Sequence, residues 1–217
     1  MSILLIQSVS DNSILFYGND IKTTETGMYV IDSKLSVPMS DNMKLTNCEL
    51  ELPSDFAPRR YCYTEDNGFY INERYVRAKL QEAINSKVSE LDNTCERIIH
   101  DGTDVTLSDG NTKHFTLDEK DQANLTGIAI ELITGADVVM WHVDDHSQHC
   151  EFYSPEDAWA IIKTLTAFKK YHITYFRDLR IYVENLTDEE RVREVSYGFE
   201  LPDEFKSDVL KSLESSL

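Results

Sequence analysis

Apolar residues recur at steps of three and four along residues 154–186, and this pattern predicts one long helix. Ser154 is a good helix cap and Pro155 suits the first helical position. At 1.5 Å per residue the helix would be about 50 Å long, more than one small domain covers. We therefore expect part of its stripe to meet a partner helix or another subunit. The stripe comprises Ala158, Ile162, Leu165, Phe168, His172, Phe176, Leu179, Val183 and Leu186, widened by Tyr171, Tyr175 and Tyr182.

A second long helix is predicted over residues 73–99, with Asn72 as its cap. Its apolar stripe is narrow and heptad-like, as in a coiled-coil seam. The helix therefore either associates with another copy or packs within the monomer, and a seam of under four heptads does not decide between these. The stripe comprises Val76, Leu80, Ile84, Val88, Leu91, Cys95 and Ile98.

Short β-rich runs fill the region before this helix. The runs Ile3–Val9 and Ile14–Tyr17 flank a polar turn and predict a hairpin. Tyr61–Tyr63 and Phe69–Ile71 flank an Asn-Gly turn and predict a second hairpin. Further strands are expected at Met28–Ile31 and Leu45–Leu52, with Pro38 in a loop between them.

Residues 100–217 alternate hairpin signals with helical ones. We expect an α+β fold with an N-terminal β module (1–72), a linking helix (73–99) and a C-terminal module of β-hairpins packed on a long helix (100–217). The elements expected in the C-terminal module are a hairpin of Asp104–Leu107 with Lys113–Leu117, a helix over Asp118–Thr134, a hairpin of Val138–Val143 with Cys150–Tyr153, the long helix, a short helix after Thr187 and a terminal helix over Asp203–Leu213.

Composition excludes several classes of protein. The chain has 217 residues and a formal net charge of −18, which disfavours a general nucleic-acid surface. The acidic residues are spread rather than clustered, which disfavours mimicry of DNA. No signal peptide and no apolar run of membrane-spanning length is apparent, so we expect a chain that folds in a reducing cytoplasm and does not contact a membrane. The four cysteines, Cys48, Cys62, Cys95 and Cys150, are far apart and predict buried thiols rather than disulfides.

The densest group of possible metal ligands lies in the hairpin before the long helix. His142, His146, His149 and Cys150 are candidate ligands, because zinc accepts imidazole and thiolate in a tetrahedral arrangement. Their spacing matches no zinc module, and a polar turn between two strands is expected there in any case. We therefore assign no metal and no other cofactor to the chain.

No catalytic residues are assigned either. Asp118, Glu119 and Asp121 resemble a general acid–base group, but carboxylates also stabilise the start of a helix. His172 lies on an apolar stripe, where a buried and hydrogen-bonded histidine is the default, and no nucleophile elbow is present. The sequence therefore predicts a protein without enzymatic activity, with hydrolysis of cell-wall or other polysaccharide as the competing hypothesis.

Four stretches of the C-terminal half resemble a domain of unknown function carried by tail-associated proteins of bacteriophages. The most specific features are the Asp121-Gln122 dipeptide and the ending from Tyr197-Gly198 to Leu201-Pro202. The resemblance spans about half of the chain and brings no catalytic residues. It is borne by Gly102–Leu125, by Trp141–Asp144 with Cys150–Ser154, by Phe168–Leu186, and by Val195–Pro202.

The resemblance implies a structural component of a virion tail, in the baseplate or a tail fibre, that acts by docking to other tail proteins. A tail-fibre assembly chaperone is the alternative, and a protein that binds or hydrolyses envelope polysaccharide is a further one. We expect assembly in the host cytoplasm and a symmetric homo-oligomer, with a trimer favoured because fibres and baseplates have three-fold and six-fold symmetry. The residues expected at interfaces are Leu80, Ile84, Val88, Leu91, Tyr171, Tyr175 and Tyr182.

Overall fold

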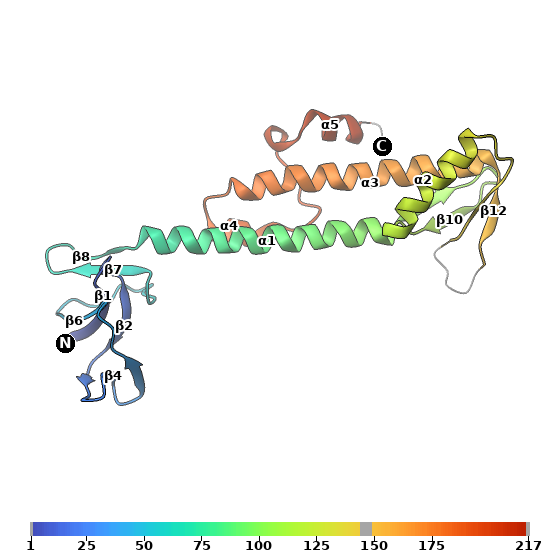
Figure 1. The fold of residues 1–217 in the computed structure, drawn as a ribbon. Helices are drawn as coiled ribbons and strands as arrows, with labels where there is room; N and C mark the ends of the chain where they lie inside the picture. Colours follow the sequence, from blue (N-terminus) through green and yellow to red (C-terminus); the bar gives the residue numbers. More distant parts are fainter. Residues whose placement is uncertain (1, 144–148, 216–217) are drawn as a thin grey trace. The chain divides into compact units, whose positions relative to one another are not determined.

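The computed structural model describes residues 2–143 and 149–215, and it confirms the α+β class expected from the sequence (Figure 1). The chain forms two compact units, residues 1–82 and 83–217. The division falls within helix α1 (Glu73–Asp101), so most of this helix belongs with the C-terminal unit. The first unit consists of strands up to the start of α1, whereas the second combines helices with two hairpins.

The first unit is built around strand β1, which pairs antiparallel with a strand on each side. A second three-stranded antiparallel sheet and a separate hairpin complete it. The first sheet has the order β2-β1-β6, the second β3-β4-β5, and β7 pairs with β8. The strands are β1 (Ile3–Ser8), β2 (Ile14–Gly18), β3 (Ile21–Thr23), β4 (Met28–Ile31), β5 (Leu35–Pro38), β6 (Met43–Cys48), β7 (Tyr61–Thr64) and β8 (Gly68–Ile71).

Adjacent residues of β1 serve two different cores, because side chains alternate between the faces of a strand. Leu5 packs with Ile14, Cys48, Tyr61 and Tyr63. Its neighbour Ile6 packs on the other side, in a cluster with Ile21, Tyr29, Ile31 and Val37. Both faces of β1 are therefore covered, which explains its nearly continuous apolar sequence.

Three predictions for this unit were wrong in detail. Strands β3 and β5 were not expected, and Pro38 ends β5 rather than lying in a loop. Each of these strands has only one buried residue, too few to produce a visible alternation. Strand β6 covers Met43–Cys48 instead of Leu45–Leu52, because its register to β1 ends where Cys48 meets Ile3.

The second unit packs two hairpins against helices. Ser154 caps α3 through its side-chain oxygen, as expected, and Asp118 caps α2. Helices α1 and α3 run antiparallel (Figure 1). The elements after α1 are β9 (Thr103–Thr106), β10 (Thr112–Phe115), α2 (Glu119–Ile133), β11 (Val139–Trp141), β12 (Glu151–Tyr153), α3 (Pro155–Glu184), α4 (Glu189–Glu194), the 3-10 helix η1 (Asp203–Phe205) and α5 (Asp208–Glu214).

One continuous core joins the end of α1, both hairpins, α2 and the first half of α3. Each element contributes one face, which follows from the helical and strand periodicities of its apolar residues. The most deeply buried members of the core include Phe115, Leu117, Ala158, Ile161 and Leu165. None of the described helices is long and apolar enough to cross a membrane.

The terminal helix expected over Asp203–Leu213 is broken in two. Its first part is η1, and α5 begins only after Ser207. The Ser207 hydroxyl accepts from the backbone N–H of Leu210 and donates to buried Asp178 of α3. Ser207 is thus both the cap of α5 and an anchor to α3, so the chain leaves the helical path there.

Candidate functional site

The start of α2 is a polar junction between hairpin β9–β10, strand β11 and helix α3. Asp118 and Asp121 form a capping box, in which each side chain accepts from the backbone N–H of the other. The N–H of Asp121 lies 2.8 Å from Oδ1 of Asp118, and these bonds hold the pKa of the Asp118 carboxyl below its ordinary value. The helix-start interpretation of these carboxylates is therefore confirmed for Asp118 and Asp121.

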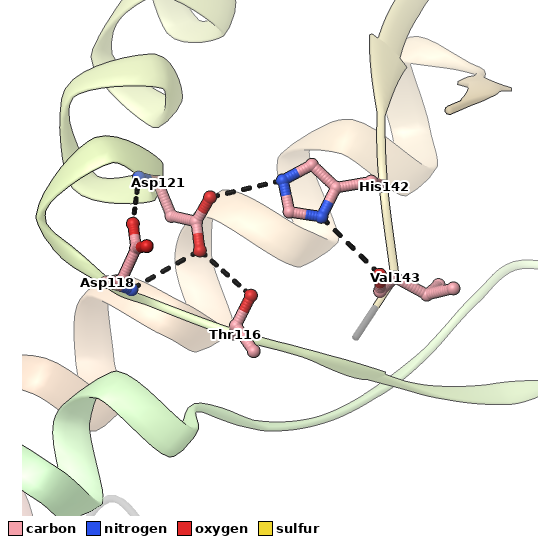
Figure 2. Close-up of polar contacts among 5 residues, drawn as sticks. All are labelled: Thr116, Asp118, Asp121, His142 and Val143. Carbon is pink, nitrogen blue, oxygen red and sulfur yellow. Dashed lines mark hydrogen bonds and ion pairs between the residues drawn. The ribbon is translucent and has the colours of Figure 1, made fainter. Parts of the chain in front are cut away.

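Asp121 is buried, with 4% of its surface exposed, and both of its carboxylate oxygens are engaged (Figure 2). Oδ2 accepts from the Thr116 hydroxyl at 2.8 Å and from the Asp118 N–H at 3.3 Å. Oδ1 lies 3.2 Å from Nε2 of His142. A buried carboxylate needs such partners, and two of them, Thr116 and His142, join α2 to the residues that follow β10 and β11.

His142 follows β11 and is held from two sides. Its ring stacks on Trp141 with centroids 5.3 Å apart. Its Nδ1 lies 3.4 Å from the carbonyl oxygen of Val143 (Figure 2). The imidazole is therefore oriented by the buried carboxylate and by the neighbouring backbone. This arrangement positions the ring of His142 and joins two elements that are 21 residues apart in sequence.

The candidate metal ligands do not form a site among the described residues. His149 and Cys150 are exposed ahead of β12, while His146 lies outside the residues that the structure describes. The described residues contain no group of three or more His, Cys, Asp or Glu side chains placed to hold a metal ion. The prediction that no metal is bound remains a prediction.

Gln122 connects α2 to its surroundings on two further sides. Its Nε2 donates to the carbonyl oxygen of Leu117 at 3.0 Å, and its Oε1 accepts from Nζ of Lys169 on α3. Two surface grooves meet at this contact. A groove of about 420 Å³ lies between α2 and α3 and has Leu125, Ile162 and Ile173 among its lining.

The second groove, of about 480 Å³, lies between α1 and α3. Its floor is apolar, and the α1 wall carries acidic side chains whereas the α3 wall carries basic ones. The α1 wall carries Asp92 and Glu96, the start of α2 adds Glu119, and the α3 wall carries Lys169, Arg177 and Arg180.

Another polar cluster lies inside the second unit, between α1, α3 and the residues after α4. Nδ1 of His172 lies 3.1 Å from the Tyr197 hydroxyl, and the Cys95 thiol donates to the carbonyl oxygen of His172 at 3.5 Å. The Tyr175 hydroxyl donates to the carbonyl oxygen of Phe199 at 2.7 Å and accepts from the N–H of Gly198.

Burial sets the protonation of this cluster. It lowers the pKa of His172 below its ordinary value and raises the pKa of the Cys95 thiol. It also raises the pKa of Tyr175 to about 12 and the pKa of Tyr197 well above its ordinary value. All four groups are therefore neutral near pH 7, as expected for buried groups that bond to one another.

Several residues predicted to lie at interfaces are covered by their own chain. Ile84, Leu91, Tyr175 and Tyr182 are buried, and Leu80, Val88 and Tyr171 are half-buried. Tyr182 packs on Phe199 and Phe205, each with ring centroids 5.1 Å apart. The C-terminal segment thus occupies part of the stripe that was expected to require a partner, whereas contact of these residues with another protein stays a prediction.

Sequence reasoning missed the partners of the most specific motif residues. Asp121 meets His142, Gln122 meets Lys169, and the His172 ring meets Tyr197. No spacing in the sequence indicates these pairs, because they join segments 21 to 47 residues apart. The only available signal was polar residues on otherwise apolar faces, which require partners when buried.

Comparison with known families identifies the chain as a member of the family described as Domain of unknown function (DUF4376), whose model matches residues 81–197. The match covers more than half of the chain and includes all three motif contacts. No curated protein matches the chain significantly. No solved structure matches it significantly either.

Proposed function

We propose that the chain is a non-enzymatic structural component of a bacteriophage tail, in the baseplate or a fibre, that acts by docking to other tail proteins. The tail assignment is supported by the sequence resemblance. The docking role is supported by an exposed apolar pair on hairpin β11–β12. Met140 and Phe152 lie directly opposite each other in this hairpin and are 59% and 76% exposed.

The pair belongs to a hairpin whose other face packs against the core of the second unit. Val139, Trp141 and Tyr153 point into the core of the second unit, so the hairpin is held firmly from one side. Side chains alternate along strands, and Met140 and Phe152 therefore occupy the opposite face. Two large adjacent apolar side chains at such exposure are typical of a protein–protein contact.

A structural role also fits the motif residues. The side chains that carry the resemblance are engaged in holding elements together: Asp121 accepts three hydrogen bonds, and Gln122 both donates and accepts. His172 is neutral and inside the fold. These bonds account for the motif without any reaction.

The docking role is tested by capture from infected cells with the tagged chain. A Met140→Ser, Phe152→Ser variant should fold normally, because the replaced side chains are exposed, and should lose the captured tail proteins. Ile133→Gln is the control, since Ile133 is 74% exposed and belongs to α2 rather than to the hairpin. Equal capture by the wild type and the double variant would contradict the proposal.

A tail-fibre assembly chaperone would expose a similar apolar face and then leave the assembly. Mass spectrometry of purified particles separates the two roles. We expect the chain in mature particles. Its absence from particles, together with its presence in the cell lysate, would favour the chaperone.

A further inference from the structure

Helix α3 carries a basic surface in an otherwise acidic chain. Between residues 163 and 180 its sequence has five basic residues and one acidic residue, Asp178, which is buried and bonded to Ser207. Lys163, Lys170 and Arg177 are exposed and form no ion pair with another described residue. The five basic residues are Lys163, Lys169, Lys170, Arg177 and Arg180.

These basic residues lie on the side of α3 that faces away from the C-terminal segment. Tyr175, Asp178 and Tyr182 contact that segment through Phe199, Ser207 and Phe205. With about 3.6 residues per turn, Arg177 is rotated about 200° from Tyr175. Lys163 and Lys170 precede Arg177 by multiples of seven residues, so all three lie along one stripe.

The C-terminal segment on the other side of α3 is strongly acidic. Residues 184–208 contain nine acidic and three basic residues. Six of the acidic side chains are exposed and form no ion pair with another described residue: Glu190, Glu194, Glu200, Asp203, Glu204 and Asp208. The exposed acidic side chains between Glu200 and Asp208 therefore lie on the opposite side of α3 from Lys163 and Lys170, whereas Arg177 also lines the groove that α1 borders with Asp92 and Glu96.

Apolar groups accompany both faces. The groove between α2 and α3 lies beside the basic stripe, with Ile162 and Ile173 in its lining and Lys169 and Lys170 at its edge. On the acidic side, Val209 of α5 is 60% exposed and follows Asp208. An apolar side chain next to acidic ones is complementary to an apolar groove edged by lysines.

We infer that copies of this chain associate head to tail, with the basic stripe of α3 in one copy against the acidic 184–208 segment of the next. The contact is heterologous because its two halves lie on opposite faces of α3, so repeated contacts build a ring or a filament rather than a closed pair. This inference is independent of the proposed tail function.

The charge of the whole chain selects this partner over a polyanion. At a net charge of −18 the chain repels nucleic acid and anionic membranes at long range. It also repels its own copies, but the Debye length is only about 8 Å at physiological ionic strength. Close pairs of opposite charge then outweigh the distant repulsion.

Sedimentation velocity on the full chain tests the inference with two variants. The basic-face variant is Lys163→Gln, Lys170→Gln and Arg177→Gln, and the acidic-face variant is Glu194→Gln, Glu200→Gln and Glu204→Gln. Lys34→Gln, Arg77→Gln and Lys120→Gln form the matched control, with the same charge change at exposed positions elsewhere.

We expect the wild type and the control to self-associate in about 0.1 M salt. In about 1 M salt, where the Debye length falls to about 3 Å, association should weaken by about tenfold or more. Each face variant alone should sediment as a single chain. An equimolar mixture of the two should form a dimer, because it offers one intact basic face and one intact acidic face.

The inference is overturned if the wild type has the mass of one chain at high micromolar concentration in low salt. It is also overturned if the basic-face variant keeps the wild-type mass, or if the mixture stays monomeric. Circular dichroism of each variant before the run establishes that loss of association is not loss of folding.

Discussion

Nζ of Lys169 on α3 donates to Oε1 of Gln122 on α2, across 47 residues of sequence. This bond lies beside the contact of Asp121 with His142, and α3 also carries His172, which meets Tyr197. These three contacts thus link the four stretches of sequence that carry the resemblance. These residues, which carry the resemblance noted in the sequence, hold α2, α3, the residue after β11 and the C-terminal segment together.

Asp121→Ala should destabilise the second unit. The substitution leaves the Thr116 hydroxyl and the Asp118 N–H without an acceptor and removes the partner of His142. Losing a charged acceptor in a buried position costs about 1–3 kcal/mol. Urea denaturation followed by circular dichroism measures this loss.

Glu119→Ala is the control for that experiment, because Glu119 is exposed in the same first turn of α2. Exposed substitutions of this kind stay within about 0.5 kcal/mol of the wild type. Equal stability of the two variants would show that the Asp121 bonds contribute nothing to the fold.

Gly102→Ala should be among the most destabilising alanine substitutions at a glycine of this chain. Gly102 joins α1 to β9 with φ at +79°, and a Cβ atom there would lie 1.8 Å from the carbonyl oxygen of Phe115. The left-handed conformation costs about 1–2 kcal/mol and the clash about 1–3 kcal/mol more. A thermal unfolding series reports the sum as a lower melting temperature.

Gly110→Ala measures the cost of the left-handed conformation without a steric clash. Gly110 has φ at +84°, but a Cβ atom there meets nothing within 4 Å. It should therefore cost only the strain of the left-handed conformation. A Gly110→Ala variant as unstable as Gly102→Ala would refute the steric explanation.

His172 should make the unit less stable as the pH falls. Burial lowers its folded pKa below the ordinary 6.5, so the unfolded chain binds more protons over this range. Its contribution is complete above about pH 6.5 and is lost as the pH falls from there towards the folded pKa. The His172→Gln variant should show a shallower fall in urea midpoint between pH 7 and pH 5.

The carboxylates are the same in the wild type and in His172→Gln, so their titration cancels when the two pH profiles are subtracted. His114→Gln is the matched control, because His114 is exposed and bonded to Asp104. An identical pH profile for the wild type and His172→Gln would show that burial does not lower the pKa of His172.

The fold class followed from the sequence because most elements have strong local signals. Ser154 and Pro155 predict the start of α3, and the Asn67-Gly68 turn predicts the hairpin of β7 and β8. Strand β5 was missed because only Val37 among its residues is buried. The break at Ser207 was missed because its cause, buried Asp178, lies 29 residues away.

The candidate site was predictable only in part, for the same physical reason. Asp118 and Asp121 cap a helix through neighbouring backbone, so their positions follow from local sequence. The bonds of Asp121 to His142 and of Gln122 to Lys169 depend on how distant elements pack. Periodicity identifies which face of a helix is buried but not which side chain will meet it.

Ile84→Asp decides whether the stripe on α1 is a core or a seam between copies. Ile84 is only 5% exposed within one chain, and Leu91, two turns further on, is buried as well. An unpaired carboxylate in that position costs several kcal/mol, because it must be desolvated without a partner. We therefore expect Ile84→Asp to unfold the second unit rather than release folded monomers.

Val76→Asp on the same helix is the control, since Val76 is 42% exposed, and it should fold normally. Light scattering with circular dichroism distinguishes the outcomes. If the wild type is an oligomer and Ile84→Asp is a folded single chain, the stripe on α1 is a seam between copies and the prediction is wrong.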